Sequence, residues 1–150
     1  MRFLLYNIRY GGGIGRRFHL PFPYSGYLKS TSRNLKRIAE FIKSEKPDIV
    51  GLVEVDSGSF RSRSKNQAKE IADLLGHYHV YQSKYGAKSF LQRIPILNKQ
   101  GNAFLTSRKV KAEKFHYFRE GVKRLIIELE LEDVKIFLVD HYFQLSHVEG

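Results

Sequence analysis

Three polar side chains stand at the ends of segments that are otherwise apolar, and these are Asn7, Glu54 and His141. An amide inside an apolar strand costs free energy unless it is paired, so Asn7 requires a partner. A carboxylate where a buried strand reaches the sheet edge, as Glu54 does, is placed to hold a hard cation such as Mg²⁺. A histidine near that cation can stabilise charge on a phosphoryl oxygen, which is the chemistry we expect of His141. Taken one at a time, the three are also explained as a backbone-pairing amide, an exposed carboxylate and a surface histidine.

Basic residues outnumber acidic ones, with 26 Lys and Arg against 15 Asp and Glu in 150 residues. The formal net charge of +11 concentrates polyanions near the protein and favours a phosphate-bearing partner. Solubility alone is the alternative explanation of the same charge. Several side chains are candidates for phosphate contact by charge and loop position: Arg16, Arg17, Arg61, Arg63, Lys84 and Lys88.

The composition excludes several classes of protein. The sequence has no Cys, so it can form no disulfide framework, no Cys-ligated zinc site and no iron–sulfur cluster. No apolar run approaches the roughly 18 residues that span a membrane. The N-terminus begins directly with a strand-like run rather than a signal peptide, so we expect a cytoplasmic protein. A hydrophobic fraction of 42% and a charged fraction of 27% indicate a globular chain that forms one domain or part of one.

Hydrophobic periodicity predicts the elements that must position these side chains. Apolar runs predict strands that end beside Asn7 and Glu54, and an apolar stripe at positions 35, 38, 39 and 42 predicts a helix between them. Polar–apolar alternation over residues 122–131 predicts a further strand. The predicted strands are 2–8, 48–55, 77–82, 101–106, 109–118, 122–131 and 134–139, and the predicted helices are 31–46 and 64–75.

The first, second and last of these strands are apolar on both faces, as central strands with layers above and below them are. The two helices can cover one face of a sheet, so something further must cover the other face. Either a second copy of the chain closes that face in a homodimer, or the chain is the front part of a larger layered domain.

Four strings in order along the chain carry a resemblance to a known family. They are Leu-Leu-Tyr-Asn-Ile at 4–8, Pro-Asp-Ile-Val-Gly-Leu-Val-Glu-Val at 47–55, Gly-Asn-Ala-Phe-Leu at 101–105 and Lys-Arg-Leu-Ile-Ile at 123–127. Over about residues 1–141 the chain resembles the endonuclease/exonuclease/phosphatase superfamily. That group includes DNase I-like nucleases, abasic-site endonucleases, sphingomyelinases and inositol-polyphosphate phosphatases.

The resemblance implies an α+β, DNase I-like layered sandwich, of which residues 1–150 form a partial domain with the first sheet and its flanking helices. It implies a phosphoester hydrolase that depends on Mg²⁺ or Mn²⁺, in the range of phosphodiesterases, phosphatases and nucleases. Glu54 matches the family's metal-binding glutamate, Asn7 the asparagine beside it, and His141 a histidine that follows a buried strand. The residues that we then expect to bind the substrate phosphate are Arg61, Arg63 and Asn102.

Two later elements of the family do not occur in these 150 residues. One is a Gly-Asp-x-Asn string with an Asp that activates water, and the other is a Ser-Asp-His string with a catalytic His. We therefore expect this chain by itself to have little or no activity. The alternative is a non-catalytic, basic module or pseudoenzyme that binds nucleic acid, because Tyr and Phe alternate with Lys and Arg over residues 78–117.

Overall fold

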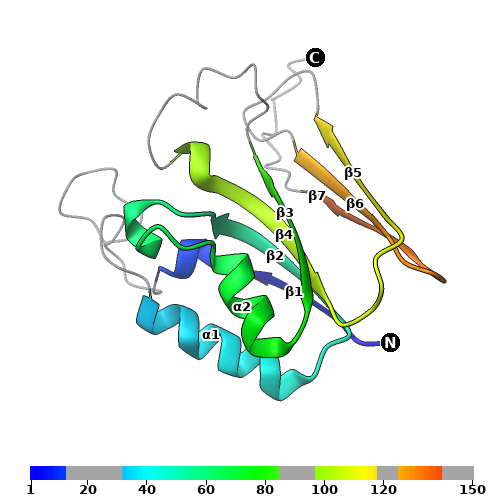
Figure 1. Cartoon of the computed structure of the whole chain (residues 1–150), viewed down its shortest axis with the longest axis horizontal. Helices are drawn as coiled ribbons and strands as arrows, with labels where there is room; N and C mark the ends of the chain where they lie inside the picture. The colour runs from blue at the N-terminus through cyan, green and yellow to red at the C-terminus, as the bar shows by residue number, and fades with distance from the viewer. Residues whose placement is uncertain (13–31, 85–96, 118–124, 140–150) are drawn as a thin grey trace, which may run out of the picture.

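The computed structural model describes residues 1–12, 32–84, 97–117 and 125–139. These residues form three layers, namely a pair of α-helices, a four-stranded sheet and a three-stranded sheet (Figure 1). The helices α1 (Ser32–Glu45) and α2 (Gln67–Leu75) cover one face of the larger sheet, and the smaller sheet packs against the other face. The predicted α+β layered sandwich is therefore confirmed.

The larger sheet brings the ends of several strands to one edge. Its order is β1-β2-β4-β3, with β1 parallel to β2 and β4 antiparallel to both β2 and β3. The last residues of β1, β2 and β3 therefore meet the first residues of β4. The strands are β1 (Phe3–Asn7), β2 (Ile49–Asp56), β3 (Tyr78–Ser83) and β4 (Gln100–Thr106), and the short 3₁₀ helices beside their ends are η1 (Arg9–Gly11), η4 (Phe60–Ser62) and η6 (Leu97–Lys99).

The smaller sheet is an antiparallel meander of β5 (Ala112–Tyr117), β6 (Leu125–Glu130) and β7 (Lys135–Val139). Alternate residues of β6 point inward, as the period of two predicted. Together with residues of the larger sheet they form a core between the sheets, which includes Ile49, Phe104, Leu125, Ile127 and Leu129. The sequence analysis expected a second copy or the rest of a larger domain to cover the second face of the larger sheet. That expectation is wrong for the centre of the face, because the smaller sheet of the same chain covers it.

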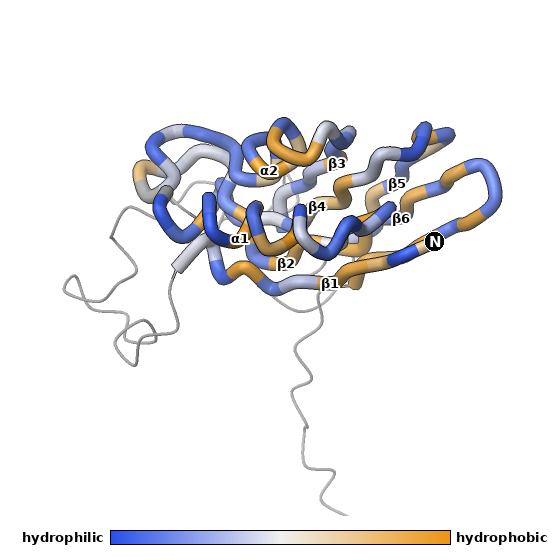
Figure 2. Tube along the Cα trace, turned by 90° about the horizontal axis from the view of Figure 1, so that it is seen from below, coloured by the Kyte–Doolittle hydropathy of each residue, from blue (hydrophilic) through white to orange (hydrophobic). Residues whose placement is uncertain are grey.

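A second core lies between the larger sheet and the helices. The apolar stripe of α1 packs there against β2, because residues three and four apart share one face of a helix. The hydrophobic colour follows the central strands, whereas the outward turns of α1 are mostly hydrophilic (Figure 2). Among the described residues, neither helix has the length and apolar character needed to cross a membrane. The buried members of this core include Leu35, Ile42, Val50, Leu52 and Ile71.

Helix α2 begins three residues later than the sequence predicts. Arg63 and Ser64 have positive φ values of 54° and 60°, which no α-helix allows. The helix instead takes Asn66 as its N-cap, and the Asn66 side chain accepts a hydrogen bond from the backbone N–H of Lys69 at 3.2 Å. It ends as predicted at Gly76, whose φ of 70° is left-handed.

The first and last strands do not bury both faces, contrary to the sequence prediction. Within the described residues β1 and β7 each lie at one edge of a sheet. Phe3 and Leu5 of β1 are 44% and 59% exposed, and Phe137 and Val139 of β7 are also exposed. The apolar pattern was identified correctly, but the smaller sheet covers only part of the face to which Phe3 and Leu5 belong.

Close packing at the start of β4 requires a glycine. A Cβ on Gly101 would lie 2.6 Å from ring atoms of Tyr81 and would also collide with the backbone oxygen of Gln82. The Tyr81 hydroxyl donates a hydrogen bond to the backbone oxygen of Lys99 at 3.0 Å, and burial raises the pKa of Tyr81 to about 12. The ring is therefore a neutral structural contact at neutral pH.

We expect Gly101→Ala to lower the free energy of unfolding by about 2 kcal/mol or more, since overpacking displaces the Tyr81 ring and the backbone of β3. Urea denaturation followed by circular dichroism measures the loss. Gly76→Ala is the matched control, because a Cβ on Gly76 would have no described atom within 4 Å. We expect this variant to lose about 1 kcal/mol of unfolding free energy, since alanine is unfavourable in a left-handed backbone conformation. Equal losses in the two variants would contradict the packing argument.

Glu128 of β6 carries an ion cluster on the outer face of the smaller sheet. Its carboxylate lies 2.8 Å from Nε2 of His116, 3.1 Å from Nζ of Lys135 and 3.9 Å from Nζ of Lys114. The hydrogen bond from His116, followed by that from Lys135, holds the pKa of Glu128 below its ordinary value of 4.5. The cluster thus ties all three strands of this sheet together.

We expect the stabilisation from Glu128 to be fully present above about pH 4.5, the ordinary pKa of the carboxyl, and to be lost as the pH falls through its lowered pKa. Urea midpoints of wild type and Glu128→Gln, measured from neutral to acidic pH, should therefore converge at the acid end. A difference between the two proteins that stays constant with pH would show that the carboxylate charge contributes nothing.

Candidate functional site

Two of the expected residues lie at adjoining strand ends. Strands β1 and β2 are parallel neighbours, and Asn7 is the register partner of Val53, the residue before Glu54. The Asn7 side chain is exposed and that of Glu54 is half-buried. The structure therefore brings this amide and this carboxylate to one edge of the larger sheet, as the sequence predicts.

Backbone strain gathers at this edge. Apart from Lys46, the non-glycine residues with positive φ in the described parts of the chain lie near the end of β1, at the end of β2, or in the loop between β2 and α2. Such conformations cost roughly 1–3 kcal/mol each and cluster at functional sites. The strained positions here are Arg9, Tyr10, Glu54, Arg63 and Ser64.

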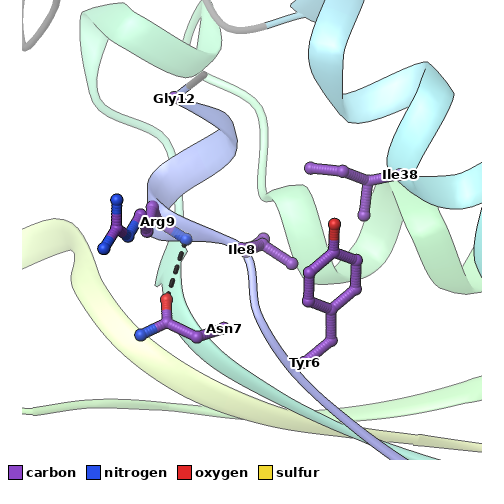
Figure 3. A pocket seen from close by; sticks show the side chains of 6 residues that line it. All are labelled: Tyr6, Asn7, Ile8, Arg9, Gly12 and Ile38. Atoms are coloured by element: carbon purple, nitrogen blue, oxygen red, sulfur yellow. Dashed lines mark hydrogen bonds between the residues drawn. The ribbon is translucent and has the colours of Figure 1, made fainter. Parts of the chain in front are cut away.

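Asn7 caps the turn that follows β1. Its Oδ1 accepts a hydrogen bond from the backbone N–H of Arg9 at 3.0 Å, on the side of the strand away from Tyr6 and Ile38 (Figure 3). An amide oxygen has two lone pairs, so this bond leaves one for a further ligand. A pocket of about 290 Å³ opens beside the strand end, and it is lined by Tyr6, Asn7, Ile8, Arg9, Gly12 and Ile38.

Glu54 pairs through its backbone with the third expected residue, Asn102. The N–H of Glu54 donates a hydrogen bond to Oδ1 of Asn102 at 3.2 Å. The Asn102 side chain is fully buried, and its Nδ2 has no hydrogen-bond partner among the described residues. Asn102 thus stands within the site, while the phosphate contact expected of it stays a prediction.

A buried polar network connects the segments that follow the strand ends. The Tyr10 hydroxyl donates a hydrogen bond to Oε1 of Gln100 at 3.1 Å, and Nε2 of Gln67 donates one to the backbone oxygen of Tyr10 at 2.8 Å. Oε1 of Gln67 accepts the N–H of Asp56 at 3.0 Å. One glutamine therefore joins η1, the end of β2 and the start of α2.

Asp56 organises the loop that carries Arg61 and Arg63. Its carboxylate accepts hydrogen bonds from the N–H groups of Gly58 at 2.9 Å and Ser59 at 2.7 Å, and from the hydroxyl groups of Ser59 and Ser62. The Arg63 side chain is exposed, as a phosphate contact requires. The Arg61 side chain lies outside the described residues, so its expected role stays a prediction.

Lys84 is not the exposed loop cation that the sequence suggested. It directly follows β3, its backbone N–H donates a hydrogen bond to the Gln100 oxygen at 2.9 Å, and its side chain is fully buried. Its Nζ lies 5.8 Å from the centre of the Tyr10 ring, within the range of a cation–π contact. The cation therefore belongs to the interior of this end of the sheet.

Sequence reasoning missed the network formed by Tyr10, Asp56, Gln67 and Gln100. Asp56 had a signal, because an Asp before Ser-Gly-Ser at the end of a strand is typical of a turn closed by its carboxylate. No local sequence pattern indicated Gln67 or Gln100, since the Tyr10 groups that they contact are distant in sequence. Of the other expected residues, His141, Arg16, Arg17 and Lys88 lie outside the described residues.

The oxygen donors at this edge fit a hard divalent cation. In the described parts of the chain, no group of three or more His, Cys, Asp and Glu side chains is placed to hold a metal ion. Mg²⁺ is usually held by one or two carboxylates and keeps several waters or substrate oxygens. Glu54 and the second lone pair of Asn7 Oδ1 are donors of that kind.

The layers and the strand order place the chain in the class of DNase I-like sandwiches. Within that class the chain belongs to the Endonuclease/Exonuclease/phosphatase family, whose sequence profile matches residues 4–143. No curated protein matches the sequence.

Solved structures share the fold at low sequence identity. An endonuclease/exonuclease/phosphatase family protein from Leptotrichia buccalis C-1013-b superposes with a TM-score of 0.62 and 16% identity, over 98% of this chain and 57% of that one. The structure of ANGEL2, described as a 2′,3′-cyclic phosphatase, superposes with a TM-score of 0.55 and 18% identity, over 90% of this chain and 38% of that one. A family protein from Beutenbergia cavernae DSM 12333 superposes with a TM-score of 0.53 and 16% identity, over 91% of this chain and 36% of that one. This chain thus spans little more than half the length of the Leptotrichia protein.

We expect Asp56→Asn to lower the free energy of unfolding by about 2–3 kcal/mol. The substitution replaces one accepting oxygen by an NH₂ group, which cannot accept a hydrogen bond, so donors of the loop lose their partner. Urea denaturation measures the loss. Asp73→Asn on α2 is the control, since its exposed carboxylate forms an i,i+4 ion pair with Lys69 at 2.6 Å. Exposed ion pairs contribute little, so we expect a change within about 0.5 kcal/mol. If both variants lost the same stability, Asp56 would not organise the loop.

Proposed function

We propose that this chain forms the metal-binding part of a phosphoester hydrolase that depends on Mg²⁺ or Mn²⁺. The observation that carries the proposal is the placement of Asn7 and Glu54 at adjoining ends of the parallel strands β1 and β2. Membership of the family and the strained backbone at the same edge support it.

In this proposal Glu54 and Asn7 hold the cation. When bound, it supplies Lewis-acid stabilisation of the charge on the phosphate. The hydrogen bond from Arg9 orients the Asn7 amide so that its oxygen faces the strand end. In the same proposal, the left-handed backbone of Glu54 sets the direction of its carboxylate.

The substrate proposed for this site is a phosphoester, including nucleic acid. Arg61, Arg63 and Asn102 are the proposed phosphate contacts, and Asp56 holds the loop that carries both arginines. The net charge of +11 supports an anionic substrate. The description of ANGEL2 as a 2′,3′-cyclic phosphatase names the same class of bond for a protein of this fold.

We propose that residues 1–150 are a partial domain with little or no turnover by itself. The sequence contains neither Gly-Asp-x-Asn nor Ser-Asp-His, and the Leptotrichia protein is considerably longer. His141 is the proposed histidine that stabilises charge on a phosphoryl oxygen. The exposed apolar residues of β1 and β7 support a cover from the rest of such a domain, and a homodimer is the alternative cover.

We expect Mn²⁺ to bind wild type and to bind Glu54→Gln at least tenfold more weakly, because a charged oxygen ligand is lost. Isothermal titration with manganese chloride measures the affinity. Glu40→Gln on α1 is the control, since its exposed carboxylate forms an i,i+4 ion pair with Lys36 at 4.0 Å. Robust hydrolysis of a chromogenic phosphodiester that survives Glu54→Gln, or unchanged Mn²⁺ affinity in that variant, would contradict the proposal.

The alternative function, a non-catalytic module that binds nucleic acid, is favoured by the net charge and by the Tyr and Phe residues among the basic ones. It predicts that single-stranded DNA binds in the absence of divalent cations and dissociates as salt rises. Fluorescence anisotropy with and without a chelator separates this outcome from the metal-dependent one.

A further inference from the structure

Strand β2 changes face at Glu54. Ile49 and Val53 belong to the core between the sheets, whereas Leu52 and Val55 belong to the core beneath the helices. In a regular strand, residues two apart share a face, so residues 53 and 55 should lie together. Their separation shows that one residue is extra.

The extra residue forms a β-bulge opposite Asn102. The register between β2 and β4 passes from Leu52 paired with Ala103 to Val55 paired with Gly101. Two residues of β2, Val53 and Glu54, therefore oppose the single residue Asn102. Bulges of this kind bend a strand and redirect a side chain.

Without the bulge, Glu54 would follow Leu52 onto the helix-side face. That face is an apolar core, where an ionised carboxylate is strongly unfavourable unless it is paired. Instead Glu54 adopts a left-handed backbone with φ of 59° and is half-buried. For an L-residue other than glycine this conformation is unfavourable, so surrounding contacts must hold it.

Asn102 supplies the acceptor within the bulge. A bulge removes the extra residue from the regular ladder, and here the Glu54 N–H donates to Oδ1 of Asn102 at 3.2 Å. The Asn102 Nδ2 is buried without a partner among the described residues, which costs free energy. A leucine of the same shape would avoid that cost, so packing stability alone does not explain an asparagine here.

We propose that Asn102 is a positioning residue for Glu54. Its amide oxygen holds the bulge in the conformation that presents the Glu54 carboxylate to the cation shared with Asn7. This inference rests on the proposed function and needs no contact between Asn102 and the substrate. It is a separate role from the phosphate contact expected from the sequence.

The test compares three variants of the ¹⁵N-labelled chain by NMR. Asn102→Leu keeps the shape and removes the acceptor, and Asn102→Asp keeps an oxygen acceptor. Thr106→Val is the matched control at the far end of β4, where the buried Thr106 hydroxyl donates to the Asp48 oxygen and accepts from the Arg108 N–H, each at 3.0 Å. The readouts are hydrogen exchange of the Glu54 amide and the Mn²⁺ concentration that broadens signals around Asn7.

We expect Asn102→Leu to speed exchange of the Glu54 amide at least tenfold relative to other β2 amides. We also expect it to weaken Mn²⁺ binding by roughly 10–100-fold, as loss of an outer-shell partner does. Thr106→Val should lose stability without either effect, and Asn102→Asp should retain protection of the Glu54 amide. A folded Asn102→Leu with wild-type exchange and wild-type Mn²⁺ affinity would overturn the inference.

Failure of the proposed function gives a different result. If Mn²⁺ binds wild type and Glu54→Gln with equal affinity, the proposed metal site is wrong, and so is the proposed role of the bulge in metal binding. If Mn²⁺ binding depends on Glu54 but not on Asn102, only the positioning role is overturned. Should Asn102→Leu not fold, loss of Glu54 amide protection in Asn102→Asp would overturn the role, and retained protection would support it.

Discussion

One extra residue in β2 determines how the site edge of the larger sheet is built. The bulge at Val53 and Glu54 lets the strand continue into the helix-side core while a charged residue is kept out of that core. The strained backbone persists because the strand around it is almost completely buried between two layers. The rigid core thus holds a conformation that a short peptide would not keep.

The segments beyond the bulge are fixed by buried polar groups rather than by regular structure. Asp56 accepts hydrogen bonds from the loop that follows it, and Gln67 connects that loop to the turn after β1. Each of these groups would be costly in the interior if it lost its partners. Buried hydrogen bonds therefore fix the loops at this edge of the sheet, and the proposed site lies beside these loops.

Two outer strands of the described sheets are exposed, unlike the buried polar groups beside the site. β1 and β7 end the described sheets, and both present apolar side chains to solvent. Edge strands of this kind offer unpaired backbone groups and an apolar surface to further chain. The residues that would form a hydrolytic site with Asn7 and Glu54 belong to such a covering layer in the function we propose.

The sequence by itself determined the layered α+β fold class, the family and the two strand ends that carry Asn7 and Glu54. It could do so because hydrophobic period and short strings are local properties of the chain. Only the tertiary structure decided that the smaller sheet packs on the larger one, that β1 and β7 are edge strands of the described sheets, that Lys84 is buried and that the Asn102 side chain accepts a hydrogen bond from the Glu54 N–H. Those features depend on which strands pair and in what register, and Glu54 and Asn102 are 48 residues apart, so no local pattern records their contact.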